Sequence, residues 1–209
     1  MVQKQTTVAA FDFDGTLTCR DTLMPFLYYY AGPLAFMRDI ARSAPTLTAY
    51  GLRLMKNDVA KERVLNRFVA GTPLAALQRQ GQAFARDRLP KLVRSVALRR
   101  MQWHQQLGHR IVIISASLDV YLKPWAAALG VDHVLCTSLE VEDSGRVSGR
   151  LGTANCYGPE KLRRLQQSLG DRSNYILYAY GDSRGDRELL ASADHSFYRI
   201  MPGAPETKE

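Results

Sequence analysis

The chain has 209 residues, of which 46% are hydrophobic and 23% charged, and it carries a formal net charge of +8. This is the composition of an ordinary globular protein, and it excludes a low-complexity chain. Every stretch of 18 residues contains a charged side chain, which argues against a transmembrane helix. The first residues also lack the long apolar run of a signal peptide.

The positive charge is concentrated in residues 18–108, which hold 15 Lys and Arg against 5 Asp and Glu. Such a segment fits an anionic substrate, an anionic membrane surface or nucleic acid, although solvated helix faces explain it equally well. The three cysteines are odd in number and widely spaced, without a Cys-x-x-Cys pair. They favour a reducing, cytoplasmic location over a disulfide framework or a zinc site.

The first predicted element is a short buried strand over residues 6–12. Residues 18–90 then show helical patterns without a strand signal, which we interpret as a helical insertion after the first strand. The expected helices span 21–31, 34–55, 58–70 and 73–89. Breaks are expected at Gly32-Pro33, Pro45, Asn57-Asp58, Gly71-Thr72-Pro73 and Leu89-Pro90.

Strands and helices alternate through the rest of the chain. Strands are expected at 110–114, 131–136 and 174–180, helices at 91–107, 117–129, 158–169 and 184–191, and a hairpin at 138–151. This alternation predicts an α/β fold with a parallel sheet, formed by residues 1–17 and 91–209. In such sheets the active site lies beyond the carboxyl ends of the strands.

Three of four short motifs fall at those strand ends, and the fourth is a lysine in a predicted helix. They are Asp12-Phe13-Asp14-Gly15-Thr16, Ser115 after residues 110–114, Lys161 in a predicted helix, and Gly181-Asp182-Ser183-Arg184-Gly185-Asp186 after 174–180. Residues two apart on a strand face the same way, so Asp12 and Asp14 are expected to address one group. Converging carboxylates repel unless a hard cation such as Mg²⁺ joins them. A carboxylate can be a nucleophile, and a hydroxyl and a lysine suit a phosphate, so the sequence predicts phosphoryl transfer.

In this order the motifs resemble the signature of the haloacid dehalogenase superfamily, and especially the branch containing phosphoserine phosphatase and phosphatidylglycerophosphatase C. The last motif departs from that branch's usual GDGxND form. The resemblance implies a Rossmann-like three-layer α/β/α core with a C1-type helical cap, residues 18–90, inserted after the first strand. It also implies a Mg²⁺-dependent phosphomonoesterase that forms an aspartyl-phosphate.

The same resemblance implies a role for each motif residue. Asp12 would be the nucleophile, and Asp14 the general acid and base, with its backbone carbonyl on Mg²⁺. Ser115 and Lys161 would contact the phosphate. The expected metal site comprises Asp12, Asp14, Asp182 and Asp186, and the expected substrate-binding residues are Gly15, Thr16, Ala116 and Asp21.

Features of the insertion bear on the substrate without deciding it. Asp21 stands where phosphoserine phosphatases usually carry a Glu that meets the substrate's amino group, but it also suits the cap of a helix starting at Thr22. The aromatic run 24–37 fits packing inside the cap, an apolar entrance or a membrane interface. Candidates for meeting the substrate's anionic groups are Arg53, Lys56, Lys61, Arg63 and Arg67.

We therefore expect a small phosphorylated substrate of the phosphoserine or histidinol-phosphate type. A lipid phosphate, with contact to an anionic membrane surface, is the alternative. Phosphotransfer between substrates and a catalytically inert basic binding module are further hypotheses. Nucleic acid is not an expected partner, and the sequence leaves the oligomeric state open.

Overall fold

The computed structural model describes residues 5–203, which contain a five-stranded parallel sheet of order β3-β2-β1-β6-β7. Its strands are β1 (Thr6–Phe11), β2 (Arg110–Leu118), β3 (His133–Thr137), β6 (Tyr175–Gly181) and β7 (His195–Tyr198). All neighbouring strands are parallel, so their carboxyl ends meet at one edge of the sheet. Since β1 lies between β2 and β6, Asp12 leaves the sheet at the middle of that edge.

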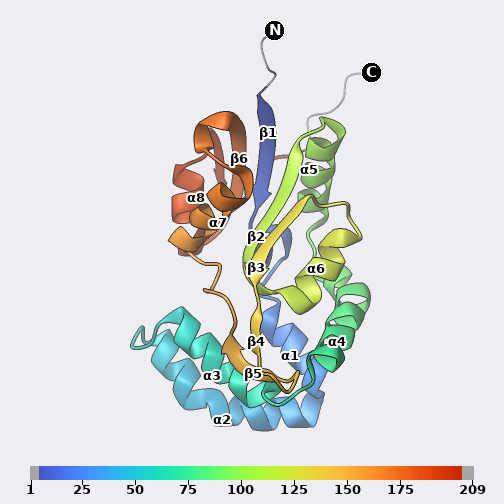
Figure 1. Ribbon diagram of the computed structural model, residues 1–209, viewed down its shortest axis with the longest axis vertical. Coiled ribbons are helices and arrows are strands. Elements are labelled where there is room, and N and C mark those ends of the chain that lie inside the picture. Colours follow the sequence, from blue (N-terminus) through green and yellow to red (C-terminus); the bar gives the residue numbers. More distant parts are fainter. Residues whose placement is uncertain (1–4, 204–209) are drawn as a thin grey trace.

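Helices cover both faces of this sheet (Figure 1). They are α5 (Ser95–Gln106) and α6 (Asp119–Ala127) on one face, and α7 (Pro159–Leu169) and α8 (Arg187–Ala191) on the other. The side chains of β1 alternate accordingly: Ala9 and Phe11 pack with α5 and α6, whereas Val8 and Ala10 pack with α7 and α8. This arrangement confirms the three-layer α/β fold expected from the sequence.

A second group of elements gathers beyond the carboxyl edge of the sheet (Figure 1). It comprises α1 (Leu23–Ala31), α2 (Pro33–Gly51), α3 (Asn57–Val69), α4 (Leu74–Asp87) and the antiparallel hairpin of β4 (Leu139–Val141) and β5 (Val147–Leu151). A Cβ on Gly149 would lie 2.3 Å from the Cα of Asn66, so β5 lies directly against α3. Backbone hydrogen bonds from Gly71 to Val147 and from Val147 to Thr72 also join the hairpin to the loop before α4.

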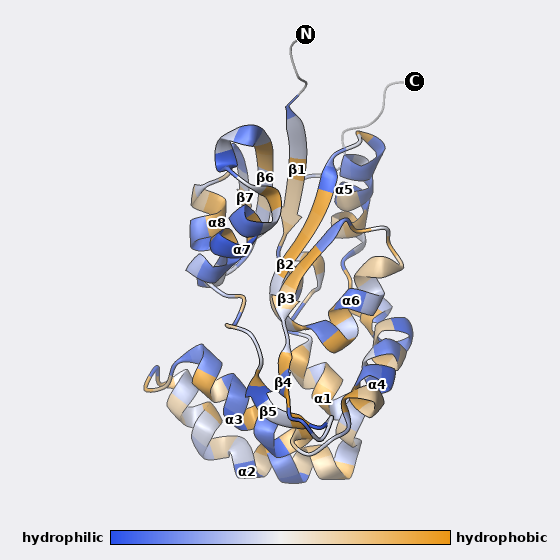
Figure 2. Cartoon of the chain, viewed as in Figure 1, coloured by the Kyte–Doolittle hydropathy of each residue, from blue (hydrophilic) through white to orange (hydrophobic). Residues whose placement is uncertain are grey.

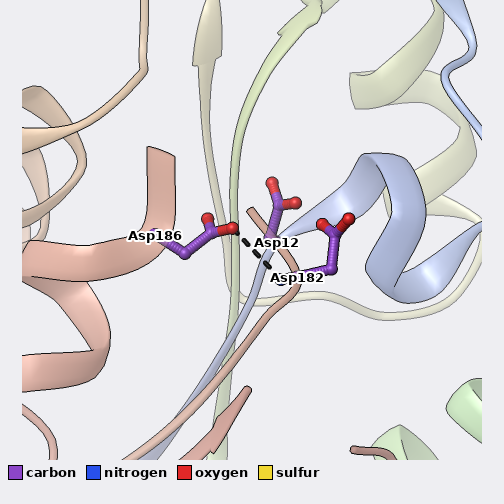
Figure 3. A group of neighbouring side chains, drawn as sticks. All are labelled: Asp12, Asp182 and Asp186. Atoms are coloured by element: carbon purple, nitrogen blue, oxygen red, sulfur yellow. Dashed lines mark hydrogen bonds between the residues drawn. The ribbon is translucent and has the colours of Figure 1, made fainter. Parts of the chain in front are cut away.

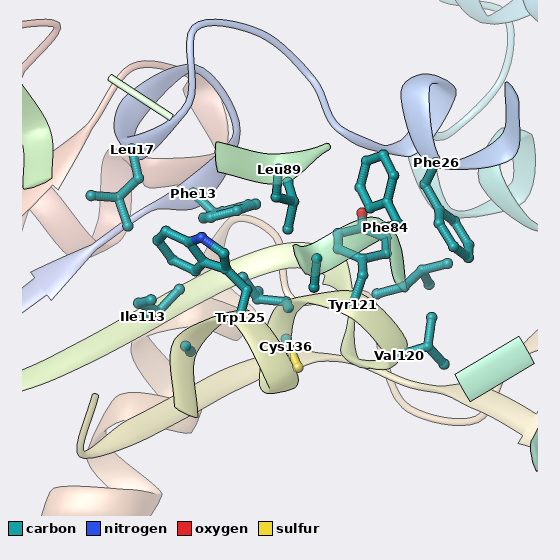
Figure 4. Packing of buried hydrophobic residues seen from close by; sticks show 14 of the residues in the cluster. Phe13, Leu17, Phe26, Phe84, Leu89, Ile113, Val120, Tyr121, Trp125 and Cys136 are labelled. Carbon is teal, nitrogen blue, oxygen red and sulfur yellow. The ribbon is translucent and has the colours of Figure 1, made fainter. Parts of the chain in front are cut away.

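Aromatic side chains connect this group to α6 (Figure 4). The rings of Phe26 and Phe84 lie 5.0 and 5.5 Å from that of Tyr121, measured between centroids. Part of the aromatic run 24–37 is therefore packing, while Leu34 and Met37 remain exposed. Within residues 5–203, none of the helices combines the length and apolarity that crossing a bilayer requires.

Two local predictions are wrong, and one strand was not predicted at all. Pro45 does not break a helix, because α2 runs continuously through it and forfeits only a local hydrogen bond. The strand expected to end at residue 114 continues to Leu118, with an irregular register against β3, so Ser115 lies within β2. The short edge strand β7 was not predicted, since four residues carry too little pattern to indicate a strand.

Candidate active site

Asp12 leaves β1 and enters a tight turn that carries Asp14. Residues Phe13–Leu17 form a tight turn in which Asp14 and Gly15 have non-helical backbone angles, closed by a 2.9 Å hydrogen bond from the Thr18 amide to the Phe13 carbonyl. Gly15 has φ of +81°, and a Cβ there would lie 2.4 Å from Asp182 Oδ2. Asp14 is therefore on a turn instead of the strand that its spacing indicated, yet both carboxylates line one depression of about 400 Å³.

Lys161 is the cation that offsets the charge of Asp12. Its Nζ donates hydrogen bonds of 2.5 Å to Asp12 Oδ1 and to Asp186 Oδ1, and all three side chains are buried. Burial lowers the pKa of Lys161, but the two carboxylates outweigh it and hold this pKa above its usual range. Burial raises the pKa of Asp12 to about 7, although Lys161 opposes the shift.

Three carboxylates converge where β1 and β6 end (Figure 3). Oxygens of Asp12, Asp182 and Asp186 all lie within 4.8 Å of one another. Both carboxylate oxygens of Asp186 accept hydrogen bonds from the protein. Its Oδ1 accepts one from Lys161, and its Oδ2 accepts two from the backbone amides of Asp182 and Ser183, at 3.2 and 3.0 Å.

Oxygen donors at this spacing fit a hard divalent cation such as Mg²⁺. The Asp182 carboxylate can still bind a cation, because the hydrogen bond that its Oδ1 accepts from Thr16 Oγ1 is long, at 3.3 Å. Asp12 is similar on its Oδ2, which Thr16 Oγ1 approaches at 3.5 Å. These two carboxylates would hold the ion, while Asp186 fixes the loop that carries Asp182.

Asp14 is held by side chains that the sequence did not single out. Ser117 Oγ and Thr22 Oγ1 each donate a 2.6 Å hydrogen bond to its carboxylate, and the Thr22 amide donates one of 2.9 Å. Burial, with the charge of Asp21 adding to it, raises the pKa of Asp14 to about 6 against these hydrogen bonds. Such a carboxyl can donate and accept protons near neutral pH.

Ser115 and Ala116 line the same depression as Asp12. Ser115 is buried, and its Oγ accepts a 3.1 Å hydrogen bond from the Ser117 amide. The position of Ser117, two residues after Ser115 on β2, was the available signal for its role, because alternate residues of a strand share a face.

Asp21 caps α1, as the alternative interpretation of this residue expected. Its Oδ1 accepts hydrogen bonds from the amides of Leu23 at 2.9 Å and Met24 at 3.3 Å. The exposed side chain also lines the depression around Asp12 and an adjoining cavity of about 300 Å³. The structure therefore places Asp21 both at a helix end and beside the site.

The adjoining cavity lies between the helical group and the core. It shares Asp14, Asp21, Asn57 and Ala116 with the catalytic depression, and its apolar wall consists of Leu23, Met24, Leu47, Ala60 and Val64. Of the five basic candidates, Lys61 is the one that lines it. Its Nζ donates to the carbonyl of Ala116 and, at 3.3 Å, to Asn155 Oδ1. Burial lowers the pKa of Lys61 to about 8, opposed by Asp14 and Asp21.

Residues 9–191 match the family model of the haloacid dehalogenase-like hydrolases. The chain belongs to this family and is a hydrolase. This match confirms the family, the fold class and the enzyme class that the four motifs indicated.

Two related proteins align with most of this chain. Protein CicA of Caulobacter vibrioides is 36% identical over 198 residues, which are 95% of this chain and 88% of CicA. A probable phosphatase of Mycobacterium tuberculosis is 28% identical over 196 residues, covering 91% of this chain and 67% of that protein.

Solved structures share the fold. A protein of unknown function from Bordetella pertussis superimposes with a TM-score of 0.77 at 24% identity, covering 90% of this chain and 87% of the other. A phosphoserine phosphatase with an analogue of its phospho-aspartyl intermediate gives a TM-score of 0.60 at 16% identity, covering 91% and 84%. At these identities the likeness concerns the fold alone.

Proposed function

We propose that this hydrolase is a Mg²⁺-dependent phosphomonoester phosphatase that works through an aspartyl-phosphate on Asp12. The observation that carries the proposal is the buried contact of Lys161 with Asp12 and Asp186, beside the exposed face of Asp182. A positioned carboxylate and fixed positive charge are what phosphoryl transfer requires. The name of the Mycobacterium tuberculosis relative supports the same class of reaction.

The residues divide the reaction between them. An oxygen of Asp12 attacks phosphorus and the bond to the alcohol oxygen breaks, while Asp14 gives that oxygen its proton. Asp14 then takes a proton from water, whose oxygen attacks phosphorus and releases phosphate from Asp12. Lys161 balances negative charge throughout. Asp12, Asp182 and the backbone carbonyl of Asp14 would hold Mg²⁺, which supplies further neutralisation of the phosphoryl oxygens.

The helical segment 18–90 acts as the cap in this proposal, and the hairpin of β4 and β5 contributes to it. The cavity beside Asp14 is at the small end of the range for ligand sites, which supports a compact phosphorylated metabolite over a two-chain lipid as substrate. Lys61 and Asp21 offer opposite charges to its alcohol part, as a phosphoserine-like substrate requires. The apolar wall supports a histidinol-phosphate-like substrate equally. Three free cysteines, all among residues 5–203, support a cytoplasmic location.

Phosphate release from purified protein tests this function. The substrates are p-nitrophenyl phosphate, phosphoserine, histidinol phosphate and phosphatidylglycerophosphate, each with Mg²⁺ and with a chelator. We expect Mg²⁺-dependent release, greatest for a compact substrate, and a higher Mg²⁺ requirement in Asp182→Asn than in the surface control Asp171→Asn. The proposal is contradicted if phosphate release does not depend on Mg²⁺, or if phosphate is transferred to an acceptor without being released. It is also contradicted if the protein releases no phosphate from any of these substrates.

A further inference from the structure

An apolar groove of about 780 Å³ lies between α1, the start of α2 and the end of α4. Its apolar and aromatic lining consists of Met24, Pro25, Tyr28, Tyr29, Pro33, Phe36, Phe84 and Leu92. Figure 2 shows the apolar colouring of α1 beside α4 in this part of the molecule. The groove is distinct from the cavity beside Asp14, although Met24 borders both.

Three cations line the same groove, and none of its lining residues is acidic. They are Arg20, Arg88 and Lys91, all exposed and without an ion-pair partner among residues 5–203. The nearby Asp87 is already paired with Arg86 at 2.8 Å. The groove therefore combines apolar surface with a net positive charge, which complements an anionic amphiphile.

Exposed apolar side chains continue this surface onto α2. Leu34 is 87% exposed and Met37 62%, and Met37 lies one helical turn after the groove residue Pro33. More than half of each of these two large apolar side chains is therefore left in contact with solvent. Arg38 and Arg42 follow on the same helix, where both pair with Asp39 at 2.7 and 3.7 Å, so this cluster adds a single net positive charge beside the apolar patch.

We propose that this face docks on an anionic lipid bilayer. Leu34, Met37 and Tyr28 enter the boundary of the acyl region, while Arg88 and Lys91 meet lipid phosphates. An acidic peptide in the groove would leave Leu34 and Met37 in water, outside its footprint, so the bilayer accounts for more of the surface. The docking needs no turnover, so it stands or fails independently of the proposed function.

Binding to lipid vesicles tests the proposal. The probes are vesicles of phosphatidylcholine with and without phosphatidylglycerol, at low and high salt, with no phosphorylated substrate present. We expect wild-type protein to bind the anionic vesicles and to be released by salt. Arg88→Ser/Lys91→Ser should weaken the partition about 25-fold, at about fivefold per cation. Leu34→Ser/Met37→Ser should weaken it about tenfold or more through lost apolar contact.

Matched controls are taken from exposed residues that do not line the groove, on α5 and β2, directly after α5 and just after β7. Arg99→Ser/Arg110→Ser removes the same charge, and Leu107→Ser/Ile200→Ser removes exposed apolar side chains. Both controls should bind like the wild type. The proposal is overturned if wild type does not bind, if the controls lose as much as the groove variants, or if the groove variants bind undiminished. Capture of an acidic peptide with no vesicle binding overturns it too.

Discussion

Asp14 depends for its orientation on two hydroxyl side chains outside the four sequence motifs. Ser117 and Thr22 each hold its carboxylate with a 2.6 Å hydrogen bond, one from β2 and the other from the start of α1. Short bonds to a carboxylate are charge-assisted and directional. In the proposed mechanism Asp14 delivers a proton to the departing oxygen, so its orientation for that step would be set jointly by the core and the helical segment.

Replacing Ser117 by Ala should therefore lower kcat for an alkyl phosphate by about 10- to 100-fold, because it removes one of the three hydrogen bonds that orient Asp14. This is part of the roughly 100- to 10,000-fold that general acid–base catalysis contributes as a whole. The loss should be smaller for p-nitrophenyl phosphate, whose leaving group departs without needing a proton. Steady-state kinetics on both substrates measure the difference, with the exposed Ser144→Ala as control. Equal losses on the two substrates would mean that Ser117 does not act through Asp14.

Gly15 is required for two separable reasons, its positive φ and its contact with Asp182. Gly108 offers a matched comparison, because its φ is +70° but a Cβ there would meet nothing within 4 Å. Both Gly15→Ala and Gly108→Ala should lose about 1–2 kcal/mol of stability from backbone strain. Only Gly15→Ala should also lose activity, by about 100-fold or more, because Asp182 must move. Full activity in a folded Gly15→Ala protein would contradict the close packing of this turn.

At the scale of elements, α3 reaches across to the core through Lys61. The ammonium group contacts the Ala116 carbonyl on β2 and Asn155 in the loop before α7, and it lines the cavity beside Asp14. Asn57, one turn earlier, accepts a 2.9 Å hydrogen bond from Asn155. The first turn of α3 thus joins the cap to the core at the site.

Replacing Lys61 by Met keeps the apolar stem but removes the charge. We expect KM for the preferred substrate to rise about tenfold or more, since a charge-assisted hydrogen bond contributes about 1.5–3 kcal/mol. KM for p-nitrophenyl phosphate should change little, and Lys56→Met, which removes an exposed charge before α3, should leave both values unaltered. An unchanged KM in Lys61→Met would exclude contact with the substrate.

The packing of α5 on β6 contains a buried histidine. His104 Nε2 lies 2.9 Å from Tyr180 Oη, and His104 Nδ1 lies 2.7 Å from His109 Nδ1. Arg100 Nε donates a hydrogen bond to the same Tyr180 Oη. Burial, with the charges of Arg100 and His109, lowers the pKa of His104 to about 3. Its neutral form is therefore the one that the fold accommodates.

This shift predicts a loss of stability in acid. In the unfolded chain His104 is protonated below pH about 6.5. In the folded protein it stays neutral down to about pH 3, so between these two values the unfolded chain binds one more proton. The free energy of unfolding should therefore fall by up to about 1.4 kcal/mol per pH unit across that window. Urea titrations above and below pH 6.5 measure the slope, which should shrink in His104→Gln and persist in His133→Gln. A slope unaltered in His104→Gln would assign the acid sensitivity to other groups.

Individual elements were predictable where the local pattern was strong. The apolar runs of β1 and β6 were predicted within a residue or so, because a buried parallel strand leaves a continuous apolar run. Ser115 was misplaced relative to β2 because small polar residues extend that strand past its apolar part. Pro45 was expected to end a helix, but its effect is local, and α2 continues through it while packing along α1 and α3.

At the scale of the whole molecule, the sequence could indicate the site only as far as its motifs reach. Asp12, Asp182 and Asp186 follow from motifs at strand ends and Lys161 from a motif at the start of a helix, and the structure brings them together. Ser117 could have been inferred from Ser115, two residues earlier on β2, whereas Thr22 lies eight residues from Asp14 across an irregular turn. The contacts of Lys61 join elements that are distant in sequence, so no local pattern indicated them. For the same reason the hairpin of β4 and β5 could be predicted as a hairpin but not as a partner of α3.

The phosphoryl group on Asp12 is the most direct test of the proposed mechanism. A reaction on the preferred substrate with Mg²⁺ is quenched in acid within one turnover, and the peptide containing Asp12 is analysed by mass spectrometry. We predict one phosphoryl group on that peptide, removable by hydroxylamine, and no turnover in a folded Asp12→Asn protein. Rapid release of phosphate without a labelled Asp12 peptide, or turnover retained in Asp12→Asn, would contradict it.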